Sequence, residues 1–393
     1  MNEQKCYKMD APFIYHKYVT GKSFIGRKSE STALANLLRQ GENIVLYEPP
    51  KTGKMSLLQH TLMEMKMKGE QFSSTSISLL NIRETADLLC SLCDAVLKTA
   101  GNSAQEFSSL AGRLLGGSHF VFDPDLYEQE GRLLRLNAEP DNEDIRIAFT
   151  LPYRIASEKG EALIITIHEF QNVMQTEDGD RICRRFAETL RQMPQELRRS
   201  CRFILSGSCV NAMKDIFQYH NYFNRLVERI ELLPIDDKTI IEHIVKGFLN
   251  GGKVIDRELL LGVNRLFRCN IWYINHFCAI CDSLSKGYIM GPTLVEALEM
   301  LISIHEPRFQ AAMNALTTFQ VRLLRAIVDG NLKFSSSAVI KQYGLSSSAN
   351  VRRLKDALCK KEIISFNEHD EPYFLDPLLE YWVRTRFFAL KAE

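Results

Sequence analysis

The chain has 393 residues, of which 45% are hydrophobic and 25% are charged. This is the composition of an ordinary globular protein, and the length suits two or three domains. Lysine and arginine number 49 and aspartate and glutamate 48, so the global charge indicates neither a nucleic-acid partner nor a membrane surface. We expect no signal peptide and no membrane partner, because no apolar run approaches the length of a membrane span. The ten scattered cysteines favour a reducing cytoplasm.

Residues 1–235 alternate between short apolar runs and amphipathic stretches. We expect strands at 43–47, 75–80, 162–167 and 202–206, and helices at 32–40, 54–68, 84–99, 145–157 and 180–197. Residues 101–145 contain glycine and proline turn signals and a run of acids, which predicts a partly helical surface excursion. The alternation predicts an α/β fold with a parallel sheet, whose ligands bind at the carboxyl ends of the strands.

A damaged phosphate-binding loop follows the first strand. The full pattern is glycine, any four residues, glycine, lysine, and then serine or threonine. Glu48 occupies the first glycine position, and Met55 occupies the position of the hydroxyl that ligates Mg²⁺. Ser56 lies about 100° further round the helix and is a doubtful substitute. The candidate nucleotide-binding residues of the loop are Thr52, Gly53, Lys54, Met55 and Ser56, with Lys54 reaching the β- and γ-phosphates.

A second departure lies at the end of the strand at 162–167. NTPases of this class end that strand in Asp-Glu, and this chain has His168-Glu169. Glu169 can still polarise an attacking water, but Mg²⁺ prefers oxygen ligands and His168 supplies none. We interpret His168 as a tolerated replacement and not as a new metal ligand. Met55 and His168 together predict that Mg²⁺ support is lost, so Mg²⁺ as a cofactor is doubtful.

Two further domains are predicted after a P-loop NTPase domain at 1–235. Residues 236–310 contain four amphipathic segments and indicate a helical lid domain. Residues 311–393 contain predicted helices at 319–328, 335–343 and 346–361 and strands at 363–366 and 373–375, which together indicate a winged helix-turn-helix.

The winged helix carries a local basic excess, with six basic residues and one acid between 341 and 361. This favours DNA as a partner, although a winged helix that packs against protein would carry the same solvated charges. The candidate DNA-binding residues are Ser347, Asn350, Arg352, Arg353 and Lys355.

Two Cys-x-x-Cys pairs, at 90–93 and 278–281, have the spacing of zinc ligands. Both lie inside apolar helical stripes without a glycine-rich knuckle. We interpret them as small buried thiols and expect no metal site there.

Several segments together resemble the archaeal-type ATPases, a branch of the STAND/AAA+ P-loop NTPases. They are FIGRKSE (24–30), LYEPPKTGKMSLL (46–58), IHEFQNV (167–173), ILSGS (204–208), NRLVERIELLPI (224–235), LTTFQVRLLRAI (316–327) and DPLLEYW (376–382). The resemblance spans 24–382, and the Phe170-Gln171 that follows the acid is specific to this family.

The resemblance implies roles for five further positions. Gly26 and Arg27 would lie near the adenine, Ser206 or Ser208 would sense the γ-phosphate, and Arg225 would be an arginine finger. The chain also departs from the family pattern, with Asn224 in place of a glycine before the finger and Cys269-Asn270-Ile271 in place of a Gly-x-Pro turn. The departures cluster at positions that contact nucleotide.

The favoured hypothesis is a regulatory protein that binds ATP or ADP, hydrolyses it weakly or not at all, and couples the nucleotide to its winged helix. One alternative is an active ATPase in which Ser56 and Glu169 suffice. Another is a non-catalytic scaffold for DNA or protein, a pseudo-ATPase that partners an active paralogue. A homo- or hetero-oligomer would let Arg225 act across an interface.

Overall fold

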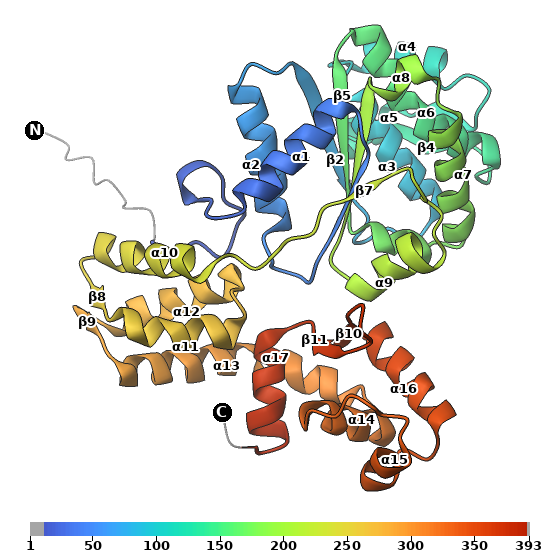
Figure 1. Cartoon of the computed structure of the whole chain (residues 1–393). Coiled ribbons are helices and arrows are strands. Elements are labelled where there is room, and N and C mark those ends of the chain that lie inside the picture. The colour runs from blue at the N-terminus through green and yellow to red at the C-terminus, as the bar shows by residue number, and fades with distance from the viewer. Residues whose placement is uncertain (1–11, 391–393) are drawn as a thin grey trace, which may run out of the picture. The chain divides into compact units, whose positions relative to one another are not determined.

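The structure is a computed structural model that describes residues 12–390, and these divide into two compact units (Figure 1). The sheet unit contains 28–50 and 57–232. The helical unit contains the described residues up to 27, the short segment Lys51–Ser56, and the chain from 233 onward. The phosphate-binding loop therefore belongs to the helical unit from Lys51 to Ser56.

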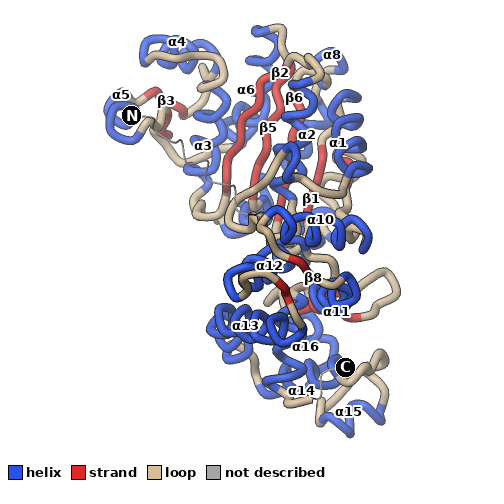
Figure 2. The backbone as a smooth tube through the Cα atoms, turned by 90° about the vertical axis from the view of Figure 1, so that its left-hand side faces the viewer, coloured by secondary structure: helices blue, strands red, loops and turns tan. Residues whose placement is uncertain are grey.

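The sheet unit is built on a five-stranded parallel sheet in the order β2-β5-β6-β1-β7, seen as parallel red strands in Figure 2. The strands are β1 (Ile44–Tyr47), β2 (Phe72–Ser78), β5 (Ala162–His168), β6 (Cys201–Gly207) and β7 (Glu228–Arg229). All four residues of β1 are buried, and so are five of the seven residues of β5. Strands that are covered on both faces have continuous apolar sequences of this kind. The predicted α/β class and the parallel sheet are confirmed.

Helices α6 and α7 pack on this sheet through aromatic rings. The ring of Phe149 in α6 stacks on Phe186 in α7 with 3.9 Å between centroids, and Phe186 meets Phe203 of β6 at 4.9 Å. The helices of the unit are α1 (Lys28–Gln40), α2 (Lys54–Met67), α3 (Thr85–Leu97), α6 (Asn142–Lys159), α7 (Gly179–Gln192), α8 (Gln195–Arg198) and α9 (Val210–Lys214), with a 3-10 helix at Phe170–Gln175 and a π-helix at Asp215–Tyr219. The helix predicted at 180–197 is broken because Pro194 interrupts it.

The surface excursion at 101–141 is more ordered than its sequence indicated. It contains α4 (Ala104–Leu114), β3 (Phe120–Phe122), α5 (Pro124–Glu130) and β4 (Leu134–Leu136), and β3 pairs with β4 as a separate antiparallel sheet. Asp94 in α3 anchors the excursion, because its carboxylate accepts a hydrogen bond from Leu133 N at 2.8 Å. The excursion is thus fastened to a core helix by a buried polar contact.

The helical unit contains the four expected lid helices and a winged helix. The lid elements are α10 (Asp237–Asn250), α11 (Arg257–Phe267), α12 (Ile271–Leu284) and α13 (Gly291–Asn314), with a short parallel pair of β8 (Val254–Ile255) and β9 (Tyr288–Ile289). The winged-helix elements are α14 (Thr318–Val328), α15 (Ser337–Tyr343), α16 (Ser348–Lys360), β10 (Ile364–Phe366), β11 (Pro372–Phe374) and α17 (Pro377–Trp382), followed by a π-helix at Val383–Phe387. A short 3-10 helix at Gly21–Ser23 lies in the N-terminal segment.

The lid and the winged helix share one hydrophobic core. Buried side chains from Phe13 to Val383 form a continuous cluster. Helix α13 runs across residue 310, and Phe309 near its end lies 5.8 Å from the ring of Trp382. Because the core is continuous and close-packed, a displacement of the lid changes the packing of the winged helix, and the reverse also holds. Among the described helices, none combines the length and the apolar character needed to cross a bilayer.

Candidate nucleotide site

The phosphate-binding loop turns tightly before α2. Lys51 and Gly53 have positive φ angles, +67° and +95°, and Lys54 is the first residue of the helix and only 8% exposed. A tight turn with backbone N–H groups at a helix N-terminus is a favourable environment for anions. The loop thus keeps the shape of a phosphate site around Thr52, Gly53 and Lys54.

Arg27 braces the loop from the N-terminal segment. Its guanidinium donates to Leu233 O at 2.8 Å and to Thr52 O at 3.2 Å. The preceding Gly26 has a φ of +62°, and a Cβ there would lie 2.8 Å from a methyl carbon of Ile235. Only glycine fits that turn without displacing Ile235. Arg27 thus contacts the phosphate-binding loop directly, and the place of Gly26 and Arg27 near an adenine stays a prediction.

Glu48 has a structural role in the sheet unit that its sequence position did not reveal. Its Oε1 accepts a hydrogen bond from Leu232 N at 3.1 Å. Leu232 lies just beyond the edge strand β7, so the carboxylate satisfies a backbone donor that the sheet leaves unpaired. The loss of the first glycine therefore has a compensating contact within the fold.

The hydroxyl position of the loop has no oxygen ligand. Met55 holds it and is 36% exposed. The hydroxyl of the next residue, Ser56, accepts a hydrogen bond from Val19 N at 3.1 Å. Ser56 is therefore engaged by the N-terminal segment, which weakens the idea that it replaces the lost ligand.

The acid at the end of β5 is held by two neighbours. Ser208 Oγ donates to Glu169 Oε2 at 2.5 Å, and Gln171 Nε2 donates to the same oxygen at 2.7 Å. Glu169 has a φ of +54°, a strained conformation for a non-glycine residue. Strain of this kind is frequent at functional positions, and two charge-assisted hydrogen bonds keep the carboxylate fixed.

His168 and Ser206 lie in register on neighbouring strands of the sheet. Burial lowers the pKa of His168, and the adjacent Glu169 only partly opposes this, so the imidazole is neutral near pH 7. Ser206 is 4% exposed, and it is Ser208 whose hydroxyl contacts Glu169. The sequence left these two serines as alternatives, and it could not separate them because both follow the same buried strand.

Arg225 lies in an exposed turn after the short helix α9, with a φ of +58°. Within the described part of the chain it forms no ion pair with its own unit. The preceding residue is Asn224 and not glycine, and the backbone still takes the left-handed conformation at Arg225. Its role as an arginine finger stays a prediction.

Solved structures resemble this chain over nearly its whole length. The Walker-type ATPase PABY2304 of Pyrococcus abyssi aligns with a TM-score of 0.66 and 17% identity, covering 95% of this chain and 99% of that one. The ORC2 protein of Aeropyrum pernix, solved as ADPNP-ADP complexes, aligns with a TM-score of 0.54 and 11% identity over 94% and 98% of the two chains. A family model described as "Probable winged helix domain" matches 307–385. No curated protein matches the chain.

This chain has the fold of a Walker-type ATPase. The resemblance to AAA+ P-loop ATPases that the motifs indicated is confirmed at the level of the fold, and the C-terminal winged helix is confirmed by its own family model. The predicted roles of individual residues stay predictions, because a fold does not specify the chemistry of a site.

The winged helix of this Walker-type fold presents only part of the predicted basic face to solvent. Arg352 and Arg353 are exposed on α16. Lys355 is paired with Asp370 at 2.8 Å, and its ammonium lies 4.1 Å from the ring centroid of Phe366. Arg352 and Arg353, together with Lys360 at the end of the helix, are exposed cations of α16 for which the described residues show no ion pair.

Ser347 and Asn350 have structural partners at the start of the same helix. Ser347 caps α16 by accepting from Asn350 N at 3.2 Å, and Asn350 Nδ2 donates to Leu345 O at 2.9 Å. The predicted N-cap at Ser347 is therefore confirmed. Both side chains therefore help to order the start of the helix.

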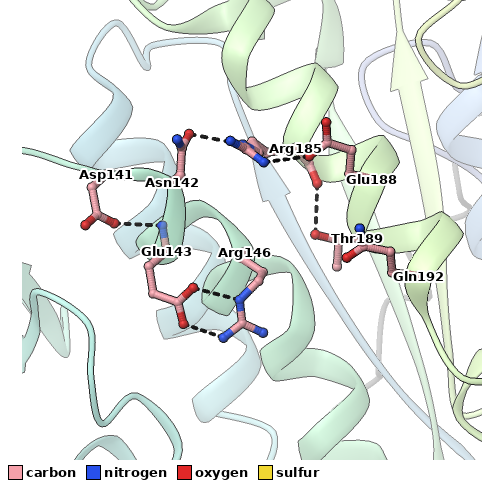
Figure 3. A pocket seen from close by; sticks show the side chains of 8 residues that line it. All are labelled: Asp141, Asn142, Glu143, Arg146, Arg185, Glu188, Thr189 and Gln192. Atoms are coloured by element: carbon pink, nitrogen blue, oxygen red, sulfur yellow. Dashed lines mark hydrogen bonds and ion pairs between the residues drawn. The ribbon is translucent and has the colours of Figure 1, made fainter.

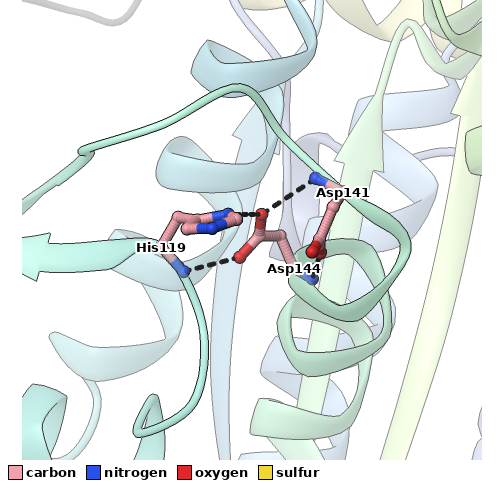
Figure 4. A group of neighbouring side chains, drawn as sticks. All are labelled: His119, Asp141 and Asp144. Atoms are coloured by element: carbon pink, nitrogen blue, oxygen red, sulfur yellow. Dashed lines mark hydrogen bonds and ion pairs between the residues drawn. The ribbon is translucent and has the colours of Figure 1, made fainter.

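One group among the described residues has metal-ligand spacing, His119 with Asp141 and Asp144 (Figure 4). Asp144 is fully buried, and its two oxygens accept from His119 N, Asp141 N and the His119 ring at 2.8, 2.9 and 2.8 Å. These three hydrogen bonds occupy the Asp144 carboxylate, which thereby links the excursion to α6. The group is structural.

A surface groove of about 390 Å³ runs between α6 and α7 (Figure 3). Its charged side chains pair with each other, since Arg146 contacts Glu143 and Arg185 contacts Glu188. Both arginines that line the groove are therefore neutralised by glutamates of the same groove. The four cysteines of the two Cys-x-x-Cys pairs are buried free thiols, and burial raises the pKa of Cys90 and Cys281 to about 12.

Proposed function

We propose that this protein binds ADP or ATP at its phosphate loop and uses the bound nucleotide to regulate its winged helix. The observation that carries the proposal is the retained Lys54, buried at the start of α2 beside a glycine in the left-handed conformation. The shared fold supports it, and one protein of that fold, the ORC2 protein, was solved with ADPNP and ADP. Nine described cysteines are free thiols, which supports a cytoplasmic location.

Hydrolysis is proposed to be weak or absent. The side chains at the expected metal positions do not fit Mg²⁺, which prefers oxygen ligands. Met55 has no oxygen, Ser56 Oγ accepts a hydrogen bond from Val19 N, and His168 offers a nitrogen. The residue that would activate water is also restrained, because two hydrogen bonds hold Glu169 Oε2 in place. Binding energy is then available for conformational change without being coupled to turnover.

The test is a calorimetric titration of the full chain with ADP and with ATP. Wild type should bind both, and Lys54→Ala should weaken binding by about tenfold or more, because a charge-assisted hydrogen bond to phosphate contributes roughly 1.5–3 kcal/mol. Lys66→Ala at the far end of the same helix is the matched control and should bind as wild type does. Absence of binding at millimolar nucleotide, or equal losses in both variants, contradicts the proposal.

An active ATPase is the competing function, and phosphate release separates the two. The proposal predicts no turnover that depends on both Lys54 and Glu169. Turnover abolished by Lys54→Ala and by Glu169→Gln would establish the ATPase in place of the switch.

A second function, DNA binding by the winged helix, is supported by Arg352 and Arg353. They lie on the exposed face of α16 without intramolecular ion pairs among the described residues. Two adjacent guanidinium groups on a helix suit phosphate contacts. Arg225, exposed in its own turn, would similarly serve a neighbouring copy if the chain forms a homo- or hetero-oligomer.

A further inference from the structure

The first turn of α12 carries two neighbouring rings that contact different parts of the helical unit. Asn270 caps this turn, accepting from the backbone N–H groups of Trp272 and Tyr273 at 3.1 and 3.2 Å. The rings of these two residues lie 5.0 Å apart, edge to face. Because they share one capped turn, a rotation of either ring is resisted by the other.

Trp272 contacts the phosphate loop. The ammonium of Lys51 lies 3.5 Å from the centroid of its ring, which is a close cation–π contact. The indole is held in place by a hydrogen bond from its Nε1 to Tyr15 O at 2.6 Å. The ring of Tyr15 in turn stacks on His276, with 4.2 Å between the ring centroids. The loop residue therefore rests on a ring that is itself held in place.

Tyr273 contacts the winged helix. Its hydroxyl lies 2.8 and 2.9 Å from the two carboxylate oxygens of Asp376, and Arg308 of α13 reaches both Asp376 and the Tyr273 hydroxyl, at 2.9 and 2.6 Å. Asp376 is also the N-cap of α17, where Oδ1 accepts from the N–H groups of Leu378 and Leu379 at 3.0 and 3.1 Å. A single carboxylate thus joins α12, α13 and the last helix of the winged helix.

His305 lies between the two rings, with centroid distances of 5.6 Å to Trp272 and 5.7 Å to Tyr273. It is 8% exposed, and its Nε2 has no hydrogen-bond partner among the described residues; the same holds for Nδ1 of the neighbouring His276. Burial and then the charges of Arg308 and Lys51 lower the pKa of His305 to about 4, so it is neutral near pH 7. Unpaired buried nitrogens leave this arrangement less stable than a fully bonded one.

We propose that the Lys51–Trp272 contact is a latch that transmits anion occupancy of the phosphate loop to Asp376 and the winged helix. The inference rests on the proposed nucleotide site. A phosphate at the loop competes with the indole for the Lys51 ammonium, and a charge-assisted hydrogen bond to phosphate is stronger than a partly exposed cation–π contact. When Lys51 leaves the indole, the first turn of α12 is free to move. This movement weakens the hydrogen bond from the Tyr273 hydroxyl to Asp376.

The electrostatics of the latch favour its release by an anion. Burial and then the charge of Arg308 lower the pKa of Lys51, and the charge of Asp376 only partly offsets them. The ammonium is therefore held in a partly desolvated, net positive setting. An incoming phosphate relieves this unfavourable environment.

The experiment combines ADP calorimetry, tryptophan emission and hydrogen exchange of the peptide around Leu378 and Leu379, all on the full chain. In wild type, ADP should change the emission that Trp272→Phe removes, and it should speed exchange in the first turn of α17 by roughly two- to fivefold, the equilibrium equivalent of an exposed cation–π contact. Lys51→Met should show the faster exchange without ADP. Lys51→Arg, which keeps a cation over the ring, is the matched control and should behave as wild type.

Tyr273→Phe separates the two halves of the latch. This variant keeps the ring and loses the hydroxyl on Asp376, so ADP should still change the emission while the exchange response falls. Normal ADP binding with unchanged emission and exchange overturns the latch and leaves the nucleotide proposal intact. Loss of ADP binding itself, in wild type, overturns both.

Discussion

Asp94 in α3 is a buried carboxylate whose ionisation the fold opposes. It is 5% exposed, its Oδ2 accepts from Leu133 N at 2.8 Å, and its Oδ1 has no hydrogen-bond partner among the described residues. Burial raises its pKa from 3.8 to about 6, and the backbone hydrogen bond from Leu133 offsets only part of this. We predict that Asp94→Asn increases the free energy of unfolding of the sheet unit at pH 7.

The sign and size of the effect follow from proton linkage. Between pH 3.8 and about 6 the folded state binds more protons at Asp94 than the unfolded state does, so the free energy of unfolding falls as pH rises through this window. A pKa difference of about 2, at 1.36 kcal/mol for each pH unit, corresponds to about 3 kcal/mol. The penalty is absent below pH 3.8 and complete above pH 6. Asparagine carries no charge, so the advantage of the variant should grow by up to about 3 kcal/mol between pH 4 and pH 7.

The assay is urea unfolding of both proteins at pH 4, 5, 6 and 7, followed by far-UV circular dichroism. Both tryptophans, Trp272 and Trp382, lie in the helical unit, so their fluorescence reports the unfolding of that unit and separates it from the sheet unit. Asp87→Asn is the matched control, because Asp87 lies in the same helix with its side chain 50% exposed. A difference between Asp94→Asn and wild type that stays constant with pH would refute the reasoning.

Three other predictions test the core, the metal position and the winged helix. Phe186→Ala should lower the free energy of unfolding by about 3–5 kcal/mol, because a fully buried ring that contacts Phe149 and Phe203 is lost; a loss below about 1 kcal/mol in urea unfolding contradicts the packing described. Met55→Ser restores an oxygen ligand and should make ADP binding tighter with Mg²⁺ than with EDTA, whereas unchanged Mg²⁺ dependence in calorimetry argues against a metal role for this position. The double variant Arg352→Ala/Arg353→Ala should weaken duplex DNA binding and reduce its salt slope by about two; an unchanged slope in gel shifts at two salt concentrations assigns DNA contact elsewhere.

The sheet unit could be predicted from sequence because its strands are short continuous apolar runs. β1, β5 and β6 lie where such runs occur, and the parallel arrangement follows from the helices between them. The winged helix was predictable for a related reason, since a serine cap and a polar turn mark its helix and wing. The helix at 180–197 was predicted too long because its apolar period continues past Pro194.

The departures at the site could be located from sequence, but their structural consequences could not. Glu48 is 184 positions away in the chain from its partner Leu232, and no local pattern reports such a pairing. The same holds for Lys51 and Trp272, which meet only after the lid has folded. Asn270 gave a partial signal, because asparagine is a favoured N-cap residue, although we predicted no cap there. Its effect, which is to present Trp272 and Tyr273 on one turn, needed the structure.

The central claim is that the phosphate loop binds nucleotide without the support of Mg²⁺. The measurement that tests it most directly is the dissociation constant of ADP for the wild-type chain, determined by calorimetry once with Mg²⁺ and once with EDTA. The account predicts measurable binding in both conditions, with constants that agree within about threefold, or less than roughly 0.7 kcal/mol. Binding that requires Mg²⁺, or no binding in either condition, would contradict it.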